Sequence, residues 1–358
     1  MIGYGNSVFL RTAWEVSGGV PPVNTVAPAI TGTAQEGQTV TCSTGTWTGT
    51  PTITFAYQWK RNGSNIGSAT NSTYTLVTAD VSQSITCQVT ATNGSGSASA
   101  TSNTITPTAA LDPDAQAFIT AAGITNPTQQ GAINNLVIGL KADGLWTKMK
   151  AIYPIVGGTA ASHKFNLKDP RDLDAAFRLT FATGVTHSST GMQGNGSSGY
   201  AETYLNDNTD LALNSAHISI YSRTNKDALM CDIGIFDAGT ISGINIFSKY
   251  TNTFFGRVHN ENTGIANSTS SFGLFVANRV GSTETRNFQN GVLKLTSGNS
   301  VAKNNSTITI MARNRGFKDF YSDRQIAFAS IGDGLSDTDG ANFYTAVQAY
   351  QTTLSRQV

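Results

Sequence analysis

Residues 286–295 read RNFQNGVLKL, and the Asn290-Gly291 pair at their centre separates two short strand-like runs. An Asn-Gly pair favours a two-residue hairpin, because both turn positions require positive φ. Residues 307–311 and 325–331 also have the β-branched and apolar composition of strands. The sequence of the last third of the chain therefore predicts an antiparallel sheet made from a hairpin and two further strands.

A helix is expected to close this region. Ser336 is a suitable N-cap, and Phe343, Val347, Tyr350 and Leu354 follow it at helical spacing. The order of hairpin, strands and terminal helix resembles the closing third of concanavalin A-like and laminin-G-like jelly rolls. That resemblance implies a two-sheet sandwich, an architecture that serves binding more often than catalysis.

The composition of the 358 residues is typical of an extracellular or virion β-protein. Charged residues make up 13% of the chain, about half the usual share. The net charge of +1 gives no broad electrostatic footprint for nucleic acid. No run of 18 apolar residues predicts a transmembrane helix, and the first residues lack the features of a signal peptide. We therefore expect no membrane insertion, no nucleic-acid partner and release by host lysis within a virus particle.

We expect a mainly β chain in four parts. These are a docking segment and linker at 1–22, an immunoglobulin-like (Ig-like) β-sandwich at 23–107, a helical connector at 108–160 and a concanavalin A-like jelly roll at 161–358. The connector has two expected helices, which follow Asp112-Pro113 and Asn126-Pro127. In the second helix an apolar stripe recurs at helical spacing and is expected to pack on the next domain. The stripe consists of Ile133, Leu136, Val137 and Leu140.

The N-terminal segment has an apolar set ahead of a Gly- and Pro-rich linker: Val8, Phe9, Leu10 and Trp14. One interpretation is a strand that pairs within its own chain. The other is a strand that adds to the sheet of a partner. A lone apolar strand has little of its own chain to cover it, so we predict that residues 1–17 dock by strand addition.

Short strand-like runs separated by Gly, Asn and Ser turns recur through the second part and suggest a β-sandwich. They lie at 39–42, 55–60, 73–76 and 84–92. Cys42, Trp59 and Cys87 have the order and approximate spacing of the immunoglobulin Cys…Trp…Cys pattern. The surrounding residues resemble the bacterial and phage Ig-like family, although Ile85 replaces the usual tyrosine before the second cysteine. Cys42 and Cys87 could pair in a disulfide, which cytoplasmic assembly would oppose.

Alternating polar and apolar residues mark further strands in the last part, at 177–181, 217–222 and 307–310. Each is expected to have one buried and one solvated face, as in an antiparallel sheet that is covered on one side.

Several runs resemble a module that recurs in tailed-bacteriophage virion proteins. They are YPIVGGTA (153–160), HKFNLKDP (163–170), FRLTF (177–181), THS (186–188) and FYTAVQ (343–348). The resemblance covers residues 110–358 and implies a structural virion protein with a lectin-like head. It implies other virion proteins as partners, homo-oligomers such as trimers, and host surface glycans as ligands.

The residue pattern offers little for catalysis. Jelly-roll glycosidases need two carboxylates that flank the scissile bond, but the five glutamates are scattered. Asp232 and Asp237 are five residues apart and would point to opposite faces of a strand. The acidic run 333–340 better fits helix N-terminal carboxylates than a calcium loop. We therefore expect no enzymatic activity, no cofactor and no metal.

A sugar site is conceivable in the loop 194–200. Asn195, Tyr200 and Tyr204 offer amides and aromatic faces that suit a pyranose. The simpler interpretation is a glycine-rich connection with tyrosine packed underneath. Together these observations favour a capsid or tail-fibre decoration subunit that adheres to host glycans. The alternatives are a polysaccharide depolymerase on the same jelly roll and a secreted bacterial adhesin.

Overall fold

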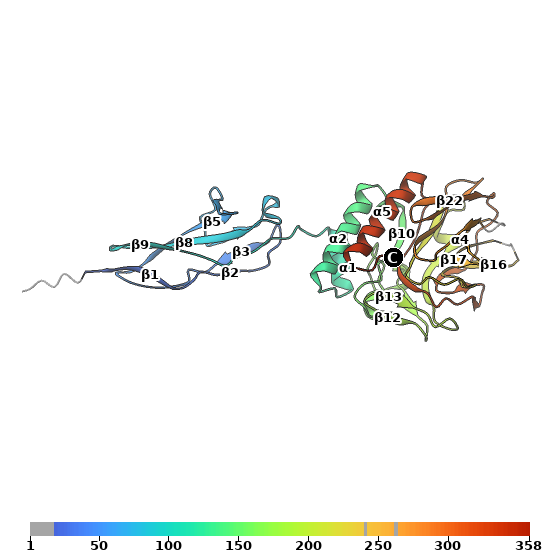
Figure 1. Cartoon of the computed structure of the whole chain (residues 1–358), viewed down its shortest axis with the longest axis horizontal. Coiled ribbons are helices and arrows are strands. Elements are labelled where there is room, and N and C mark those ends of the chain that lie inside the picture. The colour runs from blue at the N-terminus through green and yellow to red at the C-terminus, as the bar shows by residue number, and fades with distance from the viewer. Residues whose placement is uncertain (1–17, 240–241, 261–263) are drawn as a thin grey trace, which may run out of the picture. The chain divides into compact units, whose positions relative to one another are not determined.

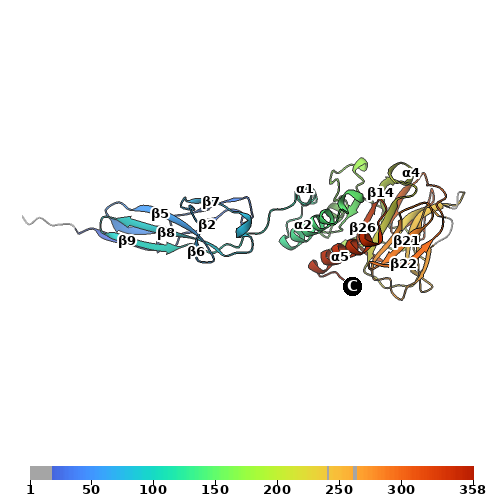
Figure 2. The same cartoon turned by 90° about the horizontal axis from the view of Figure 1, so that it is seen from above.

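The computed structural model describes residues 18–239, 242–260 and 264–358. Its contacts divide the chain into two compact units, Met1–Ala110 and Leu111–Val358, and each is described here by itself (Figures 1 and 2). Both units consist mainly of β-strands, and a helix lies at the C-terminus. This confirms the predicted fold class. None of the helices within the described residues is long and apolar enough to cross a membrane.

The first unit is the predicted Ig-like sandwich of short antiparallel strands. Its four-stranded sheet has the order β6-β5-β8-β9: β6 (Ser64–Asn65), β5 (Thr54–Arg61), β8 (Ile85–Asn93) and β9 (Gly96–Thr101). A second sheet has the order β2-β3-β7: β2 (Ile30–Thr31), β3 (Thr39–Cys42) and β7 (Thr73–Thr75). A separate pair joins β1 (Val20–Val26) to β4 (Thr46–Thr50).

Trp59 occupies the centre of the first unit. It is 0% exposed, its Nε1 donates to the carbonyl oxygen of Asn71 at 2.9 Å, and its ring stacks on that of Tyr74 at 5.4 Å. Cys42 and Cys87 are buried in the same cluster. Trp59 therefore fills the core beside the two cysteines, as in the immunoglobulin Cys…Trp…Cys pattern.

Cys42 and Cys87 are free thiols in the structure. The interaction between the two neighbouring thiols lowers the pKa of Cys42 and raises the pKa of Cys87. A disulfide between them stays a prediction for oxidising conditions.

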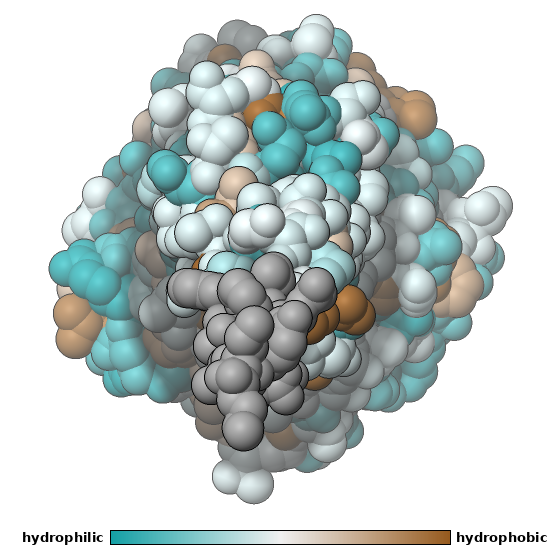
Figure 3. All heavy atoms as spheres, turned by 90° about the vertical axis from the view of Figure 1, so that its left-hand side faces the viewer, coloured by the Kyte–Doolittle hydropathy of each residue, from teal (hydrophilic) through white to brown (hydrophobic). Residues whose placement is uncertain are grey.

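The start of the first unit differs from the expected linker. Strand β1 begins at Val20 and includes both prolines of the stretch that the sequence suggested as a spacer. The expected docking residues Val8, Phe9, Leu10 and Trp14 lie outside the described residues. The face of the molecule in Figure 3 is mostly white and teal with isolated brown residues, in keeping with the polar, weakly charged composition.

The second unit has three layers, which are helices, an eight-stranded sheet and a nine-stranded sheet (Figures 1 and 2). The helices are α1 (Pro113–Ala121), α2 (Pro127–Ala142) and α5 (Asp337–Thr353). The eight-stranded sheet contains β10 (Met149–Tyr153), β12 (Thr186–Ser188), β13 (Gly191–Gln193), β15 (Ala216–Ser222), β20 (Gly273–Arg279), β21 (Thr285–Gln289), β22 (Val292–Ser297) and β26 (Gln325–Gly332).

The nine-stranded sheet lies on the side away from the helices. It contains β11 (Thr180–Phe181), β14 (Ala201–Asn206), β16 (Ile233–Asp237), β17 (Ser242–Tyr250), β18 (Thr253–Val258), β19 (Gly264–Asn267), β23 (Thr307–Ile310), β24 (Arg313–Asn314) and β25 (Lys318–Asp319). Two single-turn helices, α3 (Ala160–His163) and α4 (Asp207–Asp210), complete the unit.

Each long helix begins at the N-cap residue that the sequence predicted, and the side chain of that residue caps it. The side chain of Asp112 accepts from the backbone of Asp114 at the start of α1, and that of Asn126 accepts from Gln129 at the start of α2. Ser336 and Asp339 form a capping box at the start of α5. These contacts satisfy backbone N–H groups that the helix itself leaves without partners.

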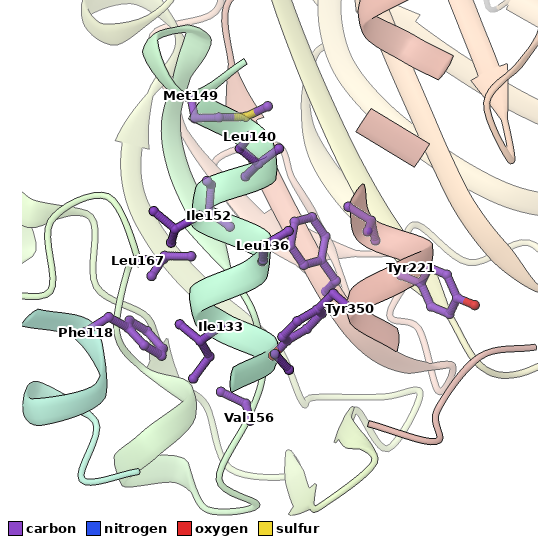
Figure 4. Close-up of a cluster of buried hydrophobic side chains, with 14 of the residues drawn as sticks. Phe118, Ile133, Leu136, Leu140, Met149, Ile152, Val156, Leu167, Tyr221 and Tyr350 are labelled. Atoms are coloured by element: carbon purple, nitrogen blue, oxygen red, sulfur yellow. The ribbon is translucent and has the colours of Figure 1, made fainter. Parts of the chain in front are cut away.

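The first hydrophobic core lies between the helices and the eight-stranded sheet (Figure 4). The predicted stripe on α2, with Ile133, Leu136 and Leu140, is fully or almost fully buried in it. Tyr350 of α5 and Ile152 of β10 belong to the same cluster. The helical connector is thus part of the second unit's core, as its apolar stripe predicted.

The second core lies between the two sheets. It takes isoleucines from both, including Ile218 and Ile220 of β15 and Ile233 and Ile235 of β16. Because side chains alternate along a strand, the neighbours of these isoleucines face outward. For the nine-stranded sheet, that outward face is the side not covered by helices.

The hairpin formed by β21 and β22 confirms the Asn-Gly prediction. Asn290 has a φ of 50° and Gly291 a φ of 73°. A Cβ on Gly291 would lie 2.9 Å from the Cβ of Tyr344 in α5. Glycine is therefore needed here both for the turn and for the close approach of the hairpin to the terminal helix.

Two of the three strands with an alternating sequence pattern are more buried than expected. Every residue of β15 is buried, as are three of the four in β23. The polar residues are accommodated by hydrogen bonds: His217 Nδ1 lies 2.6 Å from the carbonyl oxygen of Asp333, and Nε2 lies 3.0 Å from Ser330 Oγ. Burial lowers the pKa of His217 to about 4. The expectation of a solvated face was wrong for β15, because the helical layer covers the sheet's second face.

The strand predicted at 177–181 is also shorter than expected. Only Thr180–Phe181 form a strand, β11. Residues Asp174–Ala176 form a 3-10 turn, and Phe177 after it has a φ of 57°. A positive φ is incompatible with extended strand geometry, so the apparent alternation begins before the strand does.

Candidate binding site

An aromatic pocket opens on the outer face of the nine-stranded sheet. It encloses about 230 Å³ and is formed by residues of β16, β17, β18 and the segment from β24 to Phe320. Its aromatic lining consists of Phe236, Phe247, Tyr250, Phe255 and Phe320. Their inward-facing neighbours fill the core between the sheets, so this sheet is apolar on both faces at this point.

The strand register places the aromatic rings together. Phe247 on β17 is the Cα partner of Phe255 on β18. Phe247 and Phe320 have ring centroids 5.8 Å apart in an edge-to-face arrangement. Phe254, next to Phe255, faces the other way and contacts Phe275 in the core at 5.1 Å. Phe254 therefore packs in the core, and Phe255 lines the pocket.

A glycine allows a neighbouring side chain to lie against the sheet at the floor of the pocket. Gly234 of β16 is paired with Asn245 of β17, which lines the pocket. A Cβ on Gly234, whose φ is 155°, would lie 2.5 Å from both the Cβ of Asn245 and the carbonyl oxygen of Ile244. Any larger residue would displace Asn245, so the shape of the floor depends on this glycine.

Two arginines stack on the pocket's rings. The guanidinium of Arg313 lies 4.2 Å from the centroid of Phe320 and 5.1 Å from that of Phe236. The guanidinium of Arg257 lies 4.9 Å from Phe236. Such cation–π contacts hold the charged groups in fixed positions over the rings. Burial, and then the nearby positive charge of Arg313, lower the pKa of Arg257.

One carboxylate lies beside the pocket. Asp319 forms a bidentate ion pair with Arg313, at 2.9 Å to Nε and 2.8 Å to Nη2. The same carboxylate is 3.4 Å from Arg315. Among the described residues that line the pocket itself, none is acidic.

The expected sugar residues lie at another part of the same sheet. Tyr200 precedes β14 and Tyr204 lies within it, and both are half-buried on the strand's outer face. The Tyr204 hydroxyl is 3.0 Å from Thr180 Oγ1, and Lys318 lies 5.3 Å from the centre of the Tyr200 ring. The structure therefore brings the two tyrosines onto one face.

Asn195 does not join these tyrosines through its side chain. Its carbonyl oxygen accepts from the backbone of Ser197, Ser198 and Gly199, and its amide donates to Ser198 Oγ. The amide thus organises its own loop, as expected for a glycine-rich connection. Carbohydrate binding at Asn195, Tyr200 and Tyr204 stays a prediction.

The hairpin of β24 and β25 lies between the tyrosines and the aromatic pocket. Arg313 of β24 lines the pocket, whereas Lys318 of β25 forms an ion pair with Glu202 of β14 at 3.2 Å. Asp319 next to Lys318 binds Arg313. Polar and aromatic groups therefore continue across the sheet from Tyr200 to the pocket.

The acidic residues considered for catalysis have structural contacts. Asp232 is fully buried and accepts hydrogen bonds from Ser322 Oγ at 2.7 Å and Arg324 Nη1 at 3.0 Å. Asp237 lies at the end of β16, where it accepts from the backbone of Gly239 at 2.8 Å. These two carboxylates do not share a binding partner.

The acidic residues near the last helix also belong to its cap. Asp339 completes the capping box and binds Lys148, and Asp337 forms an ion pair with Arg286 at 2.8 Å. These contacts agree with the interpretation of helix N-terminal carboxylates. Within the described residues, no three His, Cys, Asp or Glu side chains gather in a way that would hold a metal ion.

The aromatic pocket was not predicted from the sequence. Its residues are spread from Leu229 to Phe320 over several strands and loops. One local signal was present: the run of residues 253–258, TFFGRV, has large side chains at successive positions. Adjacent phenylalanines on a strand must point to opposite faces, which indicates an aromatic group outside the core.

Comparison with known proteins gives likenesses of fold. No family model and no curated protein sequence matches the chain. Similar solved structures include domain 4 of AbnA, a GH43 extracellular arabinanase from Geobacillus stearothermophilus, in complex with arabinotriose. It has 12% identity and a TM-score of 0.32, and the match covers 55% of this chain and 98% of that domain.

Two further structures are similar at the same level. The botulinum neurotoxin serotype D binding domain has 13% identity and a TM-score of 0.37, over 56% of this chain and 52% of that one. A Trypanosoma rangeli sialidase has 7% identity and a TM-score of 0.35, over 73% of this chain and 43% of that one. This chain thus matches only about half of each of these two proteins. The likeness is confined to β-rich architecture and carries no functional information.

Proposed function

We propose that this chain is a structural protein of a bacteriophage particle whose second unit binds glycans of the host surface through the aromatic pocket. The observation that carries the proposal is the pocket itself, five aromatic side chains and two arginines on the outer face of the nine-stranded sheet, away from the helices that pack on the eight-stranded sheet. The phage assignment rests on the sequence resemblance of residues 110–358.

The pocket has the chemistry of a binding site for a molecule with apolar and polar faces. Ligand pockets combine aromatic walls with a few fixed polar groups, and aromatic and arginine side chains dominate many binding interfaces. A sugar ring offers C–H groups to Phe247 and Phe255 and hydroxyl groups to Asn245. The pocket therefore fits a sugar residue better than a purely apolar ligand.

The lining argues for binding without hydrolysis. Glycoside hydrolysis normally needs two carboxylates on either side of the bond, and the described lining residues include none. Of the nearby acids, Asp319 is engaged by Arg313, and Glu202 is engaged by Lys318. We therefore propose adhesion and not depolymerisation.

Replacing Phe255 by alanine tests the pocket. We expect the F255A protein to bind immobilised host envelope polysaccharide at least about tenfold more weakly, which equals about 1.4 kcal/mol. Phe317→Ala is the matched control, because Phe317 is 62% exposed and lies outside the pocket. Equal binding by the F255A and native proteins would place the ligand elsewhere. New reducing ends in the polysaccharide would instead support the depolymerase alternative.

Deletion of residues 1–17 tests the role in the particle. The described cores of both units lie outside this segment, so we expect the truncated protein to be soluble and to unfold at the native temperatures. We expect it to be missing from purified particles, because strand addition to a partner needs the deleted residues. Normal incorporation would show that the attachment lies elsewhere, most simply in the helices of 111–152.

A further inference from the structure

We infer that the aromatic pocket selects a sugar residue that carries an N-acetyl group, and that Asn245 recognises this group at the floor of the pocket. The inference rests on the proposed glycan-binding function and names the class of sugar. It stands on the burial of Asn245, on the hydrogen-bonding capacity that its side chain leaves unused, and on the apolar walls around it.

Asn245 can lie at the floor of the pocket because the neighbouring strand leaves room for it. The residues on either side of it, Ile244 and Ile246, belong to the core between the two sheets, so Asn245 faces the outer side of the sheet. Its register partner on β16 is Gly234, which has no side chain to occupy the same space. Asn245 is only 3% exposed, yet it lines the pocket. A polar side chain is therefore buried where a ligand in the pocket would contact it.

The carboxamide of Asn245 has hydrogen-bonding capacity that the described protein does not use. Its Nδ2 donates to the carbonyl oxygen of Ile235 at 3.5 Å, which is long for a hydrogen bond. Among residues 18–239, 242–260 and 264–358, none donates a hydrogen bond to its Oδ1. An amide oxygen can accept two hydrogen bonds, and buried polar groups in folded proteins nearly always have a partner. The open acceptor therefore indicates that a ligand supplies a hydrogen-bond donor here.

The walls of the pocket restrict the kind of group that can carry this donor. Phe247 lies two positions after Asn245 on β17 and so on the same face, and its partner across the strands is Phe255. Phe236 of β16 lines the pocket as well. A donor that reaches Asn245 is thus bordered by phenyl rings, and the group that carries it should also have an apolar part to place against them.

An acetamido group combines these two properties. Its N–H can donate to Oδ1 of Asn245, while its methyl group at the other end contacts the phenyl rings and is removed from water. A hydroxyl group in the same position could donate to the same oxygen, but it has no methyl group to place against the rings. The pocket should therefore bind an N-acetylated sugar more tightly than the parent sugar.

The test compares sugars that differ only in this group. The full chain is titrated by calorimetry with chitotriose and with cellotriose, which share one backbone with and without acetamido groups. The methyl glycosides of N-acetylgalactosamine and galactose, and those of N-acetylmannosamine and mannose, form two further pairs. In at least one pair we expect the acetamido form to bind at least about tenfold more tightly than the hydroxyl form.

Variants at Asn245 provide the second measurement, and the readout is the ratio of the two affinities. Asn245→Leu replaces the amide by an apolar side chain of similar size, so we expect the acetamido and hydroxyl forms to bind equally. Asn245→Asp keeps an oxygen acceptor and is expected to keep the preference, which tests the acceptor even if N245L folds poorly. Asn208→Leu is the matched control, because Asn208 is exposed and lies outside the pocket lining. We expect N208L to keep the native ratio.

The outcomes separate the inference from the proposed function. Equal binding of both members of every pair, weakened by Phe255→Ala, would overturn the N-acetyl preference and leave glycan binding intact. Binding of host envelope polysaccharide with no binding of any acetamido form would have the same meaning. A preference that persists in a folded N245L protein would also overturn the inference, because Asn245 would then not recognise the group. Absence of binding to the pairs and to the polysaccharide would overturn both.

Discussion

The Trp59→Ala protein should lose about 3–5 kcal/mol from the unfolding free energy of the first unit. The indole is fully buried, stacked on Tyr74 and hydrogen-bonded to Asn71, so its removal leaves a cavity and an unpaired carbonyl. A small domain has only about 5–15 kcal/mol of stability in total. We therefore expect the first denaturant transition to move strongly or to disappear, while the transition of the second unit keeps its midpoint.

Trp47→Ala is the matched control for this experiment. Trp47 is only partly buried, at the margin of the same cluster, and its Nε1 bonds to the carbonyl of Thr44. Its loss should cost clearly less than that of Trp59. If both variants cost the same, or if W59A unfolds like the native chain, then Trp59 is not the centre of the core.

The Asp232→Asn change is expected to destabilise the second unit by about 3–5 kcal/mol, because it leaves a buried cation without its counter-ion. Asp232 and Arg324 are both 0% exposed and lie 3.0 Å apart. Ser248 and Ser322 donate further hydrogen bonds to the same carboxylate. Thermal unfolding measured by circular dichroism would report the loss as a lower midpoint for the second unit.

Asp174→Asn serves as the comparison, since it breaks an exposed ion pair. Asp174 and Arg178 are 52% and 29% exposed, and surface pairs of this kind contribute about 0–1 kcal/mol. A stable D232N protein would contradict the structural role of Asp232. If that stable protein had also lost a polysaccharide-cleaving activity, the depolymerase alternative would gain support.

The parts of the fold that could be predicted depend on neighbours in sequence. The Asn290-Gly291 turn, the proline-initiated helices and the Ser336 cap follow from backbone preferences within a few residues, and all are present. Trp59 could be placed because its distance from two cysteines is a recurrent pattern. These features can be predicted without knowing which segments pack against one another.

The features that could not be predicted depend on which layers of the fold pack against one another. The alternation in β15 was taken to mean a solvated face, yet the helices cover that face and its polar groups pair with one another. The pocket could not be predicted for the same reason, since Phe236, Phe255 and Phe320 meet only through sheet pairing. By contrast, Tyr200 and Tyr204 were singled out because they lie close together in sequence beside the glycine-rich loop 194–200, and both are half-buried in the structure.

The order of the layers in the second unit puts the helices and the pocket on opposite sides. Helices α1, α2 and α5 close one side, the pocket opens on the other, and the chain joins this unit at Leu111, immediately before α1. Copies held through the helical side would each keep the pocket available to a repeating polymer. Under the proposed glycan-binding function, occupation of one pocket would bring the next sugars to neighbouring pockets at high effective concentration, and avidity would then exceed a single affinity by roughly 10²–10⁴-fold. Weak binding by each single pocket would then be enough for adhesion of the proposed particle.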